Sequence, residues 1–126
     1  MLVSEQEILK LKDFIFQLNS IEGNSVIIVE GKRDSRALKQ LGCQGKILEF
    51  NKFEGMIDFT DSVAKYERLI ILFDGDKKGR TLTEKTIRLL QRRTKVDLSF
   101  KKRLQEITNG KIMFVEQLVC YESFLT

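Results

Sequence analysis

The chain has 126 residues, of which 42% are hydrophobic and 32% charged, with a formal net charge of +4, and this balance excludes a disordered chain and predicts one globular domain over residues 1–126. Histidine is absent, which excludes Ser/His/Asp triads and histidine-ligated metals and leaves carboxylates, hydroxyls, Lys and Arg to carry any chemistry. No apolar run is long enough to span a membrane and residues 1–10 lack a secretion signal, so we expect a cytoplasmic protein with no membrane partner.

Apolar spacing predicts that helices and strands alternate along the chain. In chain order we expect helix 4–20, strand 25–29, helix 34–41, strand 46–50, helix 55–64, strand 69–73, helix 79–93, strand 95–98, helix 100–107 and strand 111–115. Such alternation is typical of an α/β fold, here with a mainly parallel sheet of about four to five strands flanked by helices. The apolar tail 117–125 either covers the edge of the sheet or forms a dimer contact.

Acidic residues follow the two fully apolar strands, 25–29 and 69–73. Glu30 comes directly after the first strand, and Asp74 and Asp76 follow the second. If these strands are neighbours, three carboxylates meet at the carboxyl edge of the sheet, where oxygen ligands suit Mg²⁺ and a phosphate substrate. Taken singly, Asp34, Asp74 or Asp76 is better explained as the cap of a helix, and it is the three acids at the strand ends together that favour a cation site.

Basic residues are concentrated around and after the second acidic pair. Residues 77–103 contain eleven Lys or Arg and two acidic residues, whereas the rest of the chain has an excess of acids. Such a block predicts a polyanionic partner, with nucleic acid first, although a solvated helix face is the alternative. The candidate contacts are Lys32, Arg33, Lys77, Lys78, Arg80, Arg88, Arg92 and Arg93.

Two segments resemble the glutamate and DxD motifs of the Toprim domain, which topoisomerases, bacterial-type primases and related nucleases share. They are VIIVEGKRDSRALKQLG at 26–42 and LIILFDGDKKGRTLTEKTIRLL at 69–90. The short chain and residues 95–118 further resemble small stand-alone archaeal Toprim proteins. The resemblance implies a Rossmann-like Toprim core at 25–115, after an N-terminal helix within 1–22 and before a tail at 116–126.

The resemblance also implies roles for the acids. Glu30 would act as a general acid or base or as a carboxylate beside the metal, while Asp74 and Asp76 would hold Mg²⁺, with Mn²⁺ as a substitute. Asp34 matches an acid often found four residues after the glutamate and would assist the metal site. A further ligand, if there is one, would be Asp97 or Glu116.

Three functions follow as alternatives. The first is a nucleic-acid-binding Toprim protein whose Mg²⁺-dependent carboxylates, Glu30, Asp74 and Asp76, cleave or otherwise process phosphodiesters in RNA or DNA. The second is a non-catalytic nucleic-acid-binding module that acts with a partner protein or as a homodimer. The third is a phosphoryl-transfer enzyme with a small anionic substrate. No strand-passage or zinc segment is recognisable, which argues against a complete topoisomerase or primase.

Overall fold

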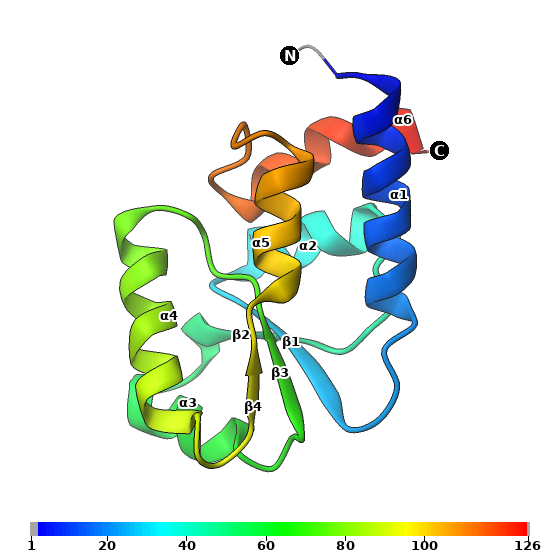
Figure 1. Ribbon diagram of the computed structural model, residues 1–126. Coiled ribbons are helices and arrows are strands. Elements are labelled where there is room, and N and C mark those ends of the chain that lie inside the picture. The colour runs from blue at the N-terminus through cyan, green and yellow to red at the C-terminus, as the bar shows by residue number, and fades with distance from the viewer. Residues whose placement is uncertain (1–2, 126) are drawn as a thin grey trace.

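Four of the predicted strands form one parallel sheet, in the order β2-β1-β3-β4 (Figure 1). The computed structural model describes residues 3–125, and its strands are β1 (Ser25–Val29), β2 (Ile47–Glu49), β3 (Arg68–Ile71) and β4 (Lys95–Asp97). The strands β1 and β3, which are apolar apart from Ser25 and Arg68 at their first positions, are neighbours in the middle of the sheet, with Ile27 beside Ile70. The predicted α/β class with a parallel sheet is therefore confirmed.

The remaining elements are helices that connect or follow the strands. The α-helices are α1 (Glu5–Asn19), α2 (Lys32–Gln40), α3 (Met56–Val63), α4 (Lys77–Leu90), α5 (Ser99–Ile107) and α6 (Glu122–Leu125), and the 3₁₀ turns are η1 (Phe50–Lys52) and η2 (Val115–Tyr121). The predicted start of α1 is confirmed, because the Ser4 hydroxyl accepts a hydrogen bond from the Glu7 backbone N–H at 3.1 Å. Gly42 follows α2 with φ of 102°, as a left-handed cap requires.

Helices cover both faces of the sheet, because successive side chains of a strand point to opposite sides. Ile27 and Ile70 lie in a core formed with α1, α2, α5 and η2, whereas Ile28 and Ile71 lie in a second core formed with α3 and α4. Figure 1 shows α1 and α5 side by side on one side of the sheet and α4 on the other. Within residues 3–125, no helix is both long and apolar enough to cross a membrane.

The strand predicted at 111–115 is wrong. This segment crosses the carboxyl edge of the sheet instead of pairing along its side. Its backbone N–H groups are used by side chains, since Met113 and Phe114 both donate to the Gln117 side-chain oxygen at 3.0 Å. The tail that follows buries Leu118 and Tyr121 in the core with α1 and α2, so it covers the protein's own helices.

Candidate metal centre and nucleic-acid surface

The carboxyl ends of β1 and β3 form the centre of the candidate site. From β1 the chain crosses to β2 on one side, and β3 lies on the other, so the strand order changes direction at this point. Open parallel sheets bind ligands at such a place. Glu30 follows β1 and Asp74 lies three residues after β3, and the exposed fractions of these two residues are 7% and 8%. The structure therefore brings the two acids together, as the motif positions predict.

Backbone N–H groups hold one oxygen of each of three carboxylates. The Asp74 N–H donates to Glu30 Oε1 at 3.1 Å, and the Val115 N–H donates to Asp74 Oδ1 at 2.7 Å. The Gly79 N–H donates to Asp76 Oδ1 at 2.8 Å. Within residues 3–125 the second oxygen of these carboxylates accepts no hydrogen bond, which leaves it available to a cation.

The first turn of α4 lies directly against the two buried acids. A Cβ atom at Gly79 would be 1.9 Å from the Asp74 carbonyl oxygen and 2.9 Å from Glu30 Oε1. Such distances are far below van der Waals contact, so no residue larger than glycine fits without moving the helix. The absence of a side chain at Gly79 therefore allows the start of α4, which Asp76 caps, to lie close to Glu30 and Asp74.

Burial and mutual repulsion make the carboxylates hard to ionise. Burial raises the pKa of Asp74 to about 7, and the neighbouring charges of Asp34, Glu30 and Asp76 act in the same direction. Burial also raises the pKa of Glu30, with Asp76 adding to the effect. A divalent cation would offset this repulsion, so the charge and the hard oxygen donors fit Mg²⁺.

The carboxylates do not form a complete cage. In the part of the chain that the structure describes, no three Asp, Glu or Cys side chains are gathered closely enough to hold a metal ion by themselves. Mg²⁺ sites that act on phosphates commonly use one or two carboxylates, with water and substrate oxygens completing the shell. The arrangement of Glu30, Asp74 and Asp76 is compatible with such an open site.

Asp34 is buried beside this centre but also has a structural role. Its carboxylate accepts a hydrogen bond from the Gly31 N–H at 3.1 Å, which caps α2. A backbone hydrogen bond from Glu116 joins the same carboxylate to η2, although burial raises the pKa of Asp34 overall. The capping interpretation of Asp34 and of Asp76 is thus correct, and it does not remove either acid from the edge of the sheet.

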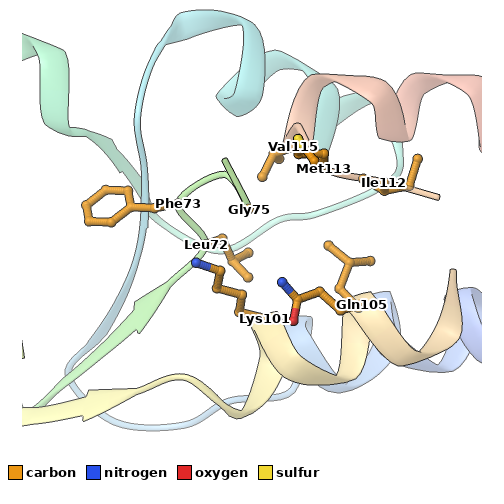
Figure 2. A pocket seen from close by; sticks show the side chains of 9 residues that line it. Leu72, Phe73, Gly75, Lys101, Gln105, Ile112, Met113 and Val115 are labelled. Carbon is orange, nitrogen blue, oxygen red and sulfur yellow. The ribbon is translucent and has the colours of Figure 1, made fainter. Parts of the chain in front are cut away.

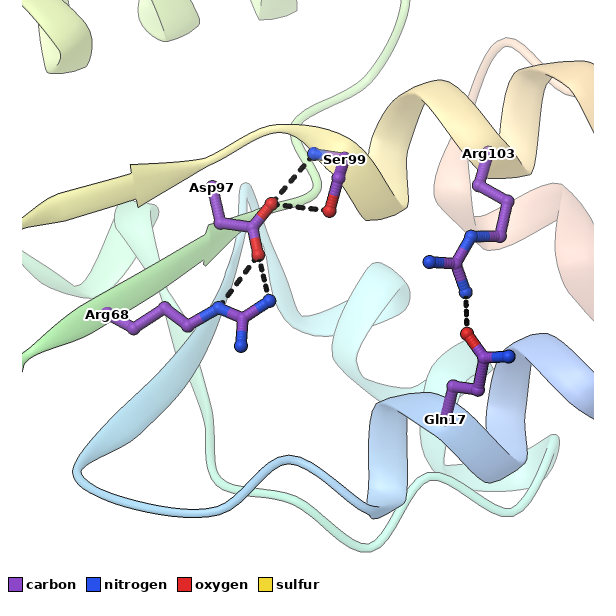
Figure 3. A network of polar contacts seen from close by, with 5 residues as sticks. All are labelled: Gln17, Arg68, Asp97, Ser99 and Arg103. Carbon is purple, nitrogen blue, oxygen red and sulfur yellow. Dashed lines mark hydrogen bonds and ion pairs between the residues drawn. The ribbon is translucent and has the colours of Figure 1, made fainter.

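The two further acids lie in different surroundings. Asp97 is bound by the Arg68 guanidinium and by the backbone and hydroxyl of Ser99 at the start of α5 (Figure 3). Those contacts lower the pKa of Asp97 despite its burial, and they assign both of its oxygens to structural partners. Glu116 instead lies near Asp34 and within 3.9 Å of Arg33.

The predicted basic contacts divide into two groups. The edge group lies at the starts of the two helices that follow the acids, and consists of Lys32 and Arg33 in α2 and Lys77, Lys78 and Arg80 in α4. The distal group consists of Arg88 in the last turn of α4 and Arg92 and Arg93 beyond it. At a rise of about 1.5 Å per residue, Arg88 lies about 12 Å along α4 from Arg80, and Arg92 and Arg93 follow the end of the helix.

Lys101 belongs to the basic block at 77–103, but the residue types of that block give no reason to single it out as a site residue. It lies in the first turn of α5 with its Nζ 3.4 Å from Thr83 Oγ1, and it interacts electrostatically with Glu30 and Asp74. Burial lowers the pKa of Lys101, while those acids oppose the effect. Its position in the chain could have indicated its role, because the helix that follows β4 directly begins at the same edge of the sheet as the acids.

Comparison with known proteins agrees with this geometry. The family model of the Toprim domain matches residues 25–107. A UPF0292 protein of Pyrococcus furiosus is 35% identical over 86% of this chain and 81% of its own length. A UPF0292 protein of Methanosarcina barkeri is 31% identical over 92% of this chain and 82% of its own length. The structure of a putative protein from Aquifex aeolicus aligns with a TM-score of 0.68 and 28% identity, over 85% of this chain and 96% of that one.

Proposed function

Because this chain belongs to the Toprim domain family, we propose that it binds RNA or DNA and cleaves or otherwise processes phosphodiesters with Mg²⁺ at its carboxylate centre. The observation that carries the proposal is the pair of buried acids, Glu30 and Asp74, joined by a hydrogen bond at the ends of the central strands. A contribution to stability does not explain this pair, because two buried carboxylates repel each other.

The oxygens that would hold the ion are those left free by the backbone. In this proposal Asp74 and Asp76 bind Mg²⁺, or Mn²⁺ in its place, through their second oxygens, and Asp34 supports them electrostatically. Mg²⁺ held there would supply positive charge to the phosphate oxygens. The Val115 and Gly79 N–H groups fix the two aspartates in orientation before any ligand arrives, which lowers the entropic cost of forming the site.

Glu30 is proposed to move the proton. Its raised pKa brings the carboxylate closer to the range in which it can both accept and release a proton. In hydrolysis, the Glu30 carboxylate accepts a proton from the attacking water as the new P–O bond forms. The bond to the leaving oxygen then breaks, and that oxygen takes a proton from solvent.

The edge group is proposed to neutralise the nucleic-acid backbone around the centre. Burial raises the pKa of Glu30, and Lys78 is close enough for its charge to oppose that rise. The other cations of the group lie in the first turns of α2 and α4. Phosphate contacts of this kind give affinity without sequence preference. The distal group would extend the same contact along α4.

A non-catalytic module is the second candidate. The observation that favours it is the incomplete cage, since the described residues do not gather three metal ligands. In that case the carboxylates position a phosphate, and a partner protein carries out the chemistry.

The test follows end-labelled RNA and DNA in the presence of Mg²⁺ or Mn²⁺, on native and denaturing gels. Wild type is compared with Glu30→Gln and Asp74→Asn, and with Asp61→Asn as a matched control, because Asp61 is an exposed acid on α3 paired with Arg93 at 3.3 Å. Shortened products from wild type and the control, absent from the two site variants, would establish a nuclease. Retarded but intact strands with every protein would favour the non-catalytic module, and equal cleavage by all of them would place the chemistry elsewhere.

A further inference from the structure

A groove between α4 and α5 opens beside the carboxylate centre. It has a volume of about 460 Å³. Its lining residues are Thr83, Leu98, Ser99, Lys101, Lys102 and Gln105. Two of the six are lysines and none is acidic, so the groove is electropositive and suited to an anion.

Lys101 connects this groove to the acids. It lines the groove and also the small cavity beside Gly75 (Figure 2). In Figure 2 the side chains of Lys101 and Gln105 leave α5 on the same side and extend toward the loop that contains Gly75. The amine is thus shared between the two spaces, with carboxylates on one side and the open groove on the other.

The hydrogen bonds of Lys101 leave capacity for a ligand. The Thr83 hydroxyl donates to the Gly79 carbonyl oxygen at 2.8 Å, so its oxygen can accept from the Lys101 amine at 3.4 Å. This contact holds the amine at the wall of the groove. An ammonium group has three donors, and two of them are left for the oxygens of an anion.

We propose that the α4–α5 groove is a phosphate subsite, in which Lys101 binds a backbone phosphate of nucleic acid next to the one held at the carboxylate centre. The inference rests on the proposed function for the identity of the polyanion. Lys102, which is exposed on the same turn of α5, lies at the rim of the subsite. In this proposal the nucleic-acid strand runs from the edge group onto α5, away from the distal group.

The role of Lys101 predicts two effects of opposite sign. Lys101→Met keeps the length of the side chain and removes its charge. Loss of a phosphate contact should weaken nucleic-acid binding about 5-fold and reduce the slope of log K against log salt by about 0.7 for a single strand. Loss of a cation beside Glu30 and Asp74 should instead tighten Mn²⁺ binding, by a few-fold, because like-charge repulsion is removed.

The experiment measures both affinities on the full chain. Fluorescein-labelled single strands of mixed-sequence RNA and DNA are titrated in EDTA over a range of salt concentrations, and Mn²⁺ binding is followed separately by electron paramagnetic resonance. Lys101→Arg retains the charge and should retain the slope. Lys95→Met is the matched control, because Lys95 is exposed at the opposite end of β4 and should change neither quantity.

The outcomes separate this inference from the proposed function. A lower slope together with tighter Mn²⁺ binding, confined to Lys101→Met, supports the subsite. If wild type binds nucleic acid and Lys101→Met behaves like Lys95→Met, the subsite is overturned while the proposed function stands. If both affinities fall together, Lys101 supports the fold instead and the subsite is likewise overturned. Failure of wild type to bind either strand would overturn both proposals.

Discussion

The two ends of α4 carry similar charged residues in different surroundings. At its start, Asp76 and the first-turn lysines lie beside the buried carboxylates of Glu30 and Asp74. At its end, Arg93 pairs with Asp61, and both side chains are largely open to water. A surface pair of that kind contributes little to stability. The comparison teaches that burial beside other acids, and not the residue type, makes a carboxylate costly to ionise and available to a metal.

The largest expected effect concerns Asp74 and pH. The pKa of its carboxyl in the folded protein, about 7, lies above the ordinary value of 3.8, so the folded state binds this proton more tightly than the unfolded state does. The free energy of unfolding in EDTA should therefore fall as pH rises from about 4 to about 7 and then level off. Asp74→Asn removes this contribution, and its stability relative to wild type should rise by up to about 4 kcal/mol over that range.

Asp61→Asn is the control for this measurement, since it removes an exposed acid at the other end of α4. Its stability relative to wild type should stay within about 0.5 kcal/mol over the same pH range. Urea unfolding of the three proteins at several pH values gives the result. Parallel curves for wild type and Asp74→Asn would show that burial does not disfavour ionisation of Asp74.

The next effect in size concerns the contact between α4 and the acids. Gly79→Ala would place its Cβ against a backbone oxygen that cannot move aside. Alanine is favoured over glycine within a helix by about 1 kcal/mol, but overpacking costs about 1–3 kcal/mol, so we expect net destabilisation and at least a tenfold loss of Mn²⁺ affinity. Chemical denaturation and metal titration measure the two quantities.

Gly45→Ala is the matched control for that substitution. Its Cβ would lie 3.3 Å from the terminal methyl group of Ile27, which can adjust, and the position is remote from the carboxylates. We expect its stability to change by less than about 1 kcal/mol and its Mn²⁺ affinity to be unchanged. Equal behaviour of the two alanine variants would contradict the close packing of α4 on the site.

A smaller effect separates the two basic groups. Replacing Lys77, Lys78 and Arg80 by Ala should weaken nucleic-acid binding about 30-fold. Replacing Arg88, Arg92 and Arg93 by Ala should weaken it by about 3-fold, because these residues lie about 12 Å or more beyond Arg80 along the direction of α4. Filter binding over a range of salt concentrations measures both triple variants. A larger loss in the distal variant would mean that the nucleic acid runs along α4 and not across the edge of the sheet.

Most of the fold, and the meeting of the two acids at the centre of the site, could be predicted from the sequence. Runs such as 25–29 and 69–73 predict buried strands because, apart from Ser25, both of their faces lack polar residues, and parallel strands end at a common edge. The meeting of Glu30 and Asp74 follows from those two facts. The run of basic residues was a poorer guide to position, since α4 carries its later members, Arg88, Arg92 and Arg93, away from the carboxylates.

Long-range contacts limited the prediction of the C-terminal region. Residues 111–115 have a strand-like composition, but the Val115 N–H is used by the Asp74 carboxylate and the Gly75 N–H by the Met113 carbonyl oxygen. Neither partner is visible in the local sequence. The same holds for Lys101, whose importance depends on where α5 begins relative to Thr83 and the acids.

The smallest expected effect concerns the anchor of that region. The Glu7 carboxylate accepts hydrogen bonds from Lys111 Nζ at 2.8 Å and from the Tyr121 hydroxyl at 3.2 Å. The Lys111 contact lowers the pKa of Glu7, whereas burial and the Glu7 charge raise the pKa of Tyr121 to about 12. The Glu7 carboxylate therefore connects the start of α1 to Lys111 and Tyr121, on either side of Val115, whose N–H donates to Asp74.

Glu7→Gln should reduce the free energy of unfolding by about 1 kcal/mol at neutral pH, since it exchanges a charged acceptor for a neutral one. The folded-state pKa of Glu7 is depressed, so the difference from wild type should shrink as pH falls through that pKa and the wild-type carboxylate is protonated. Glu5→Gln, an exposed acid in the same turn, is the control. Hydrogen exchange at the Val115 amide should quicken in Glu7→Gln alone. An unchanged rate would mean that the hydrogen bond from Val115 to Asp74 does not depend on the Glu7 contacts, and that the start of α1 is not coupled to the carboxylate centre.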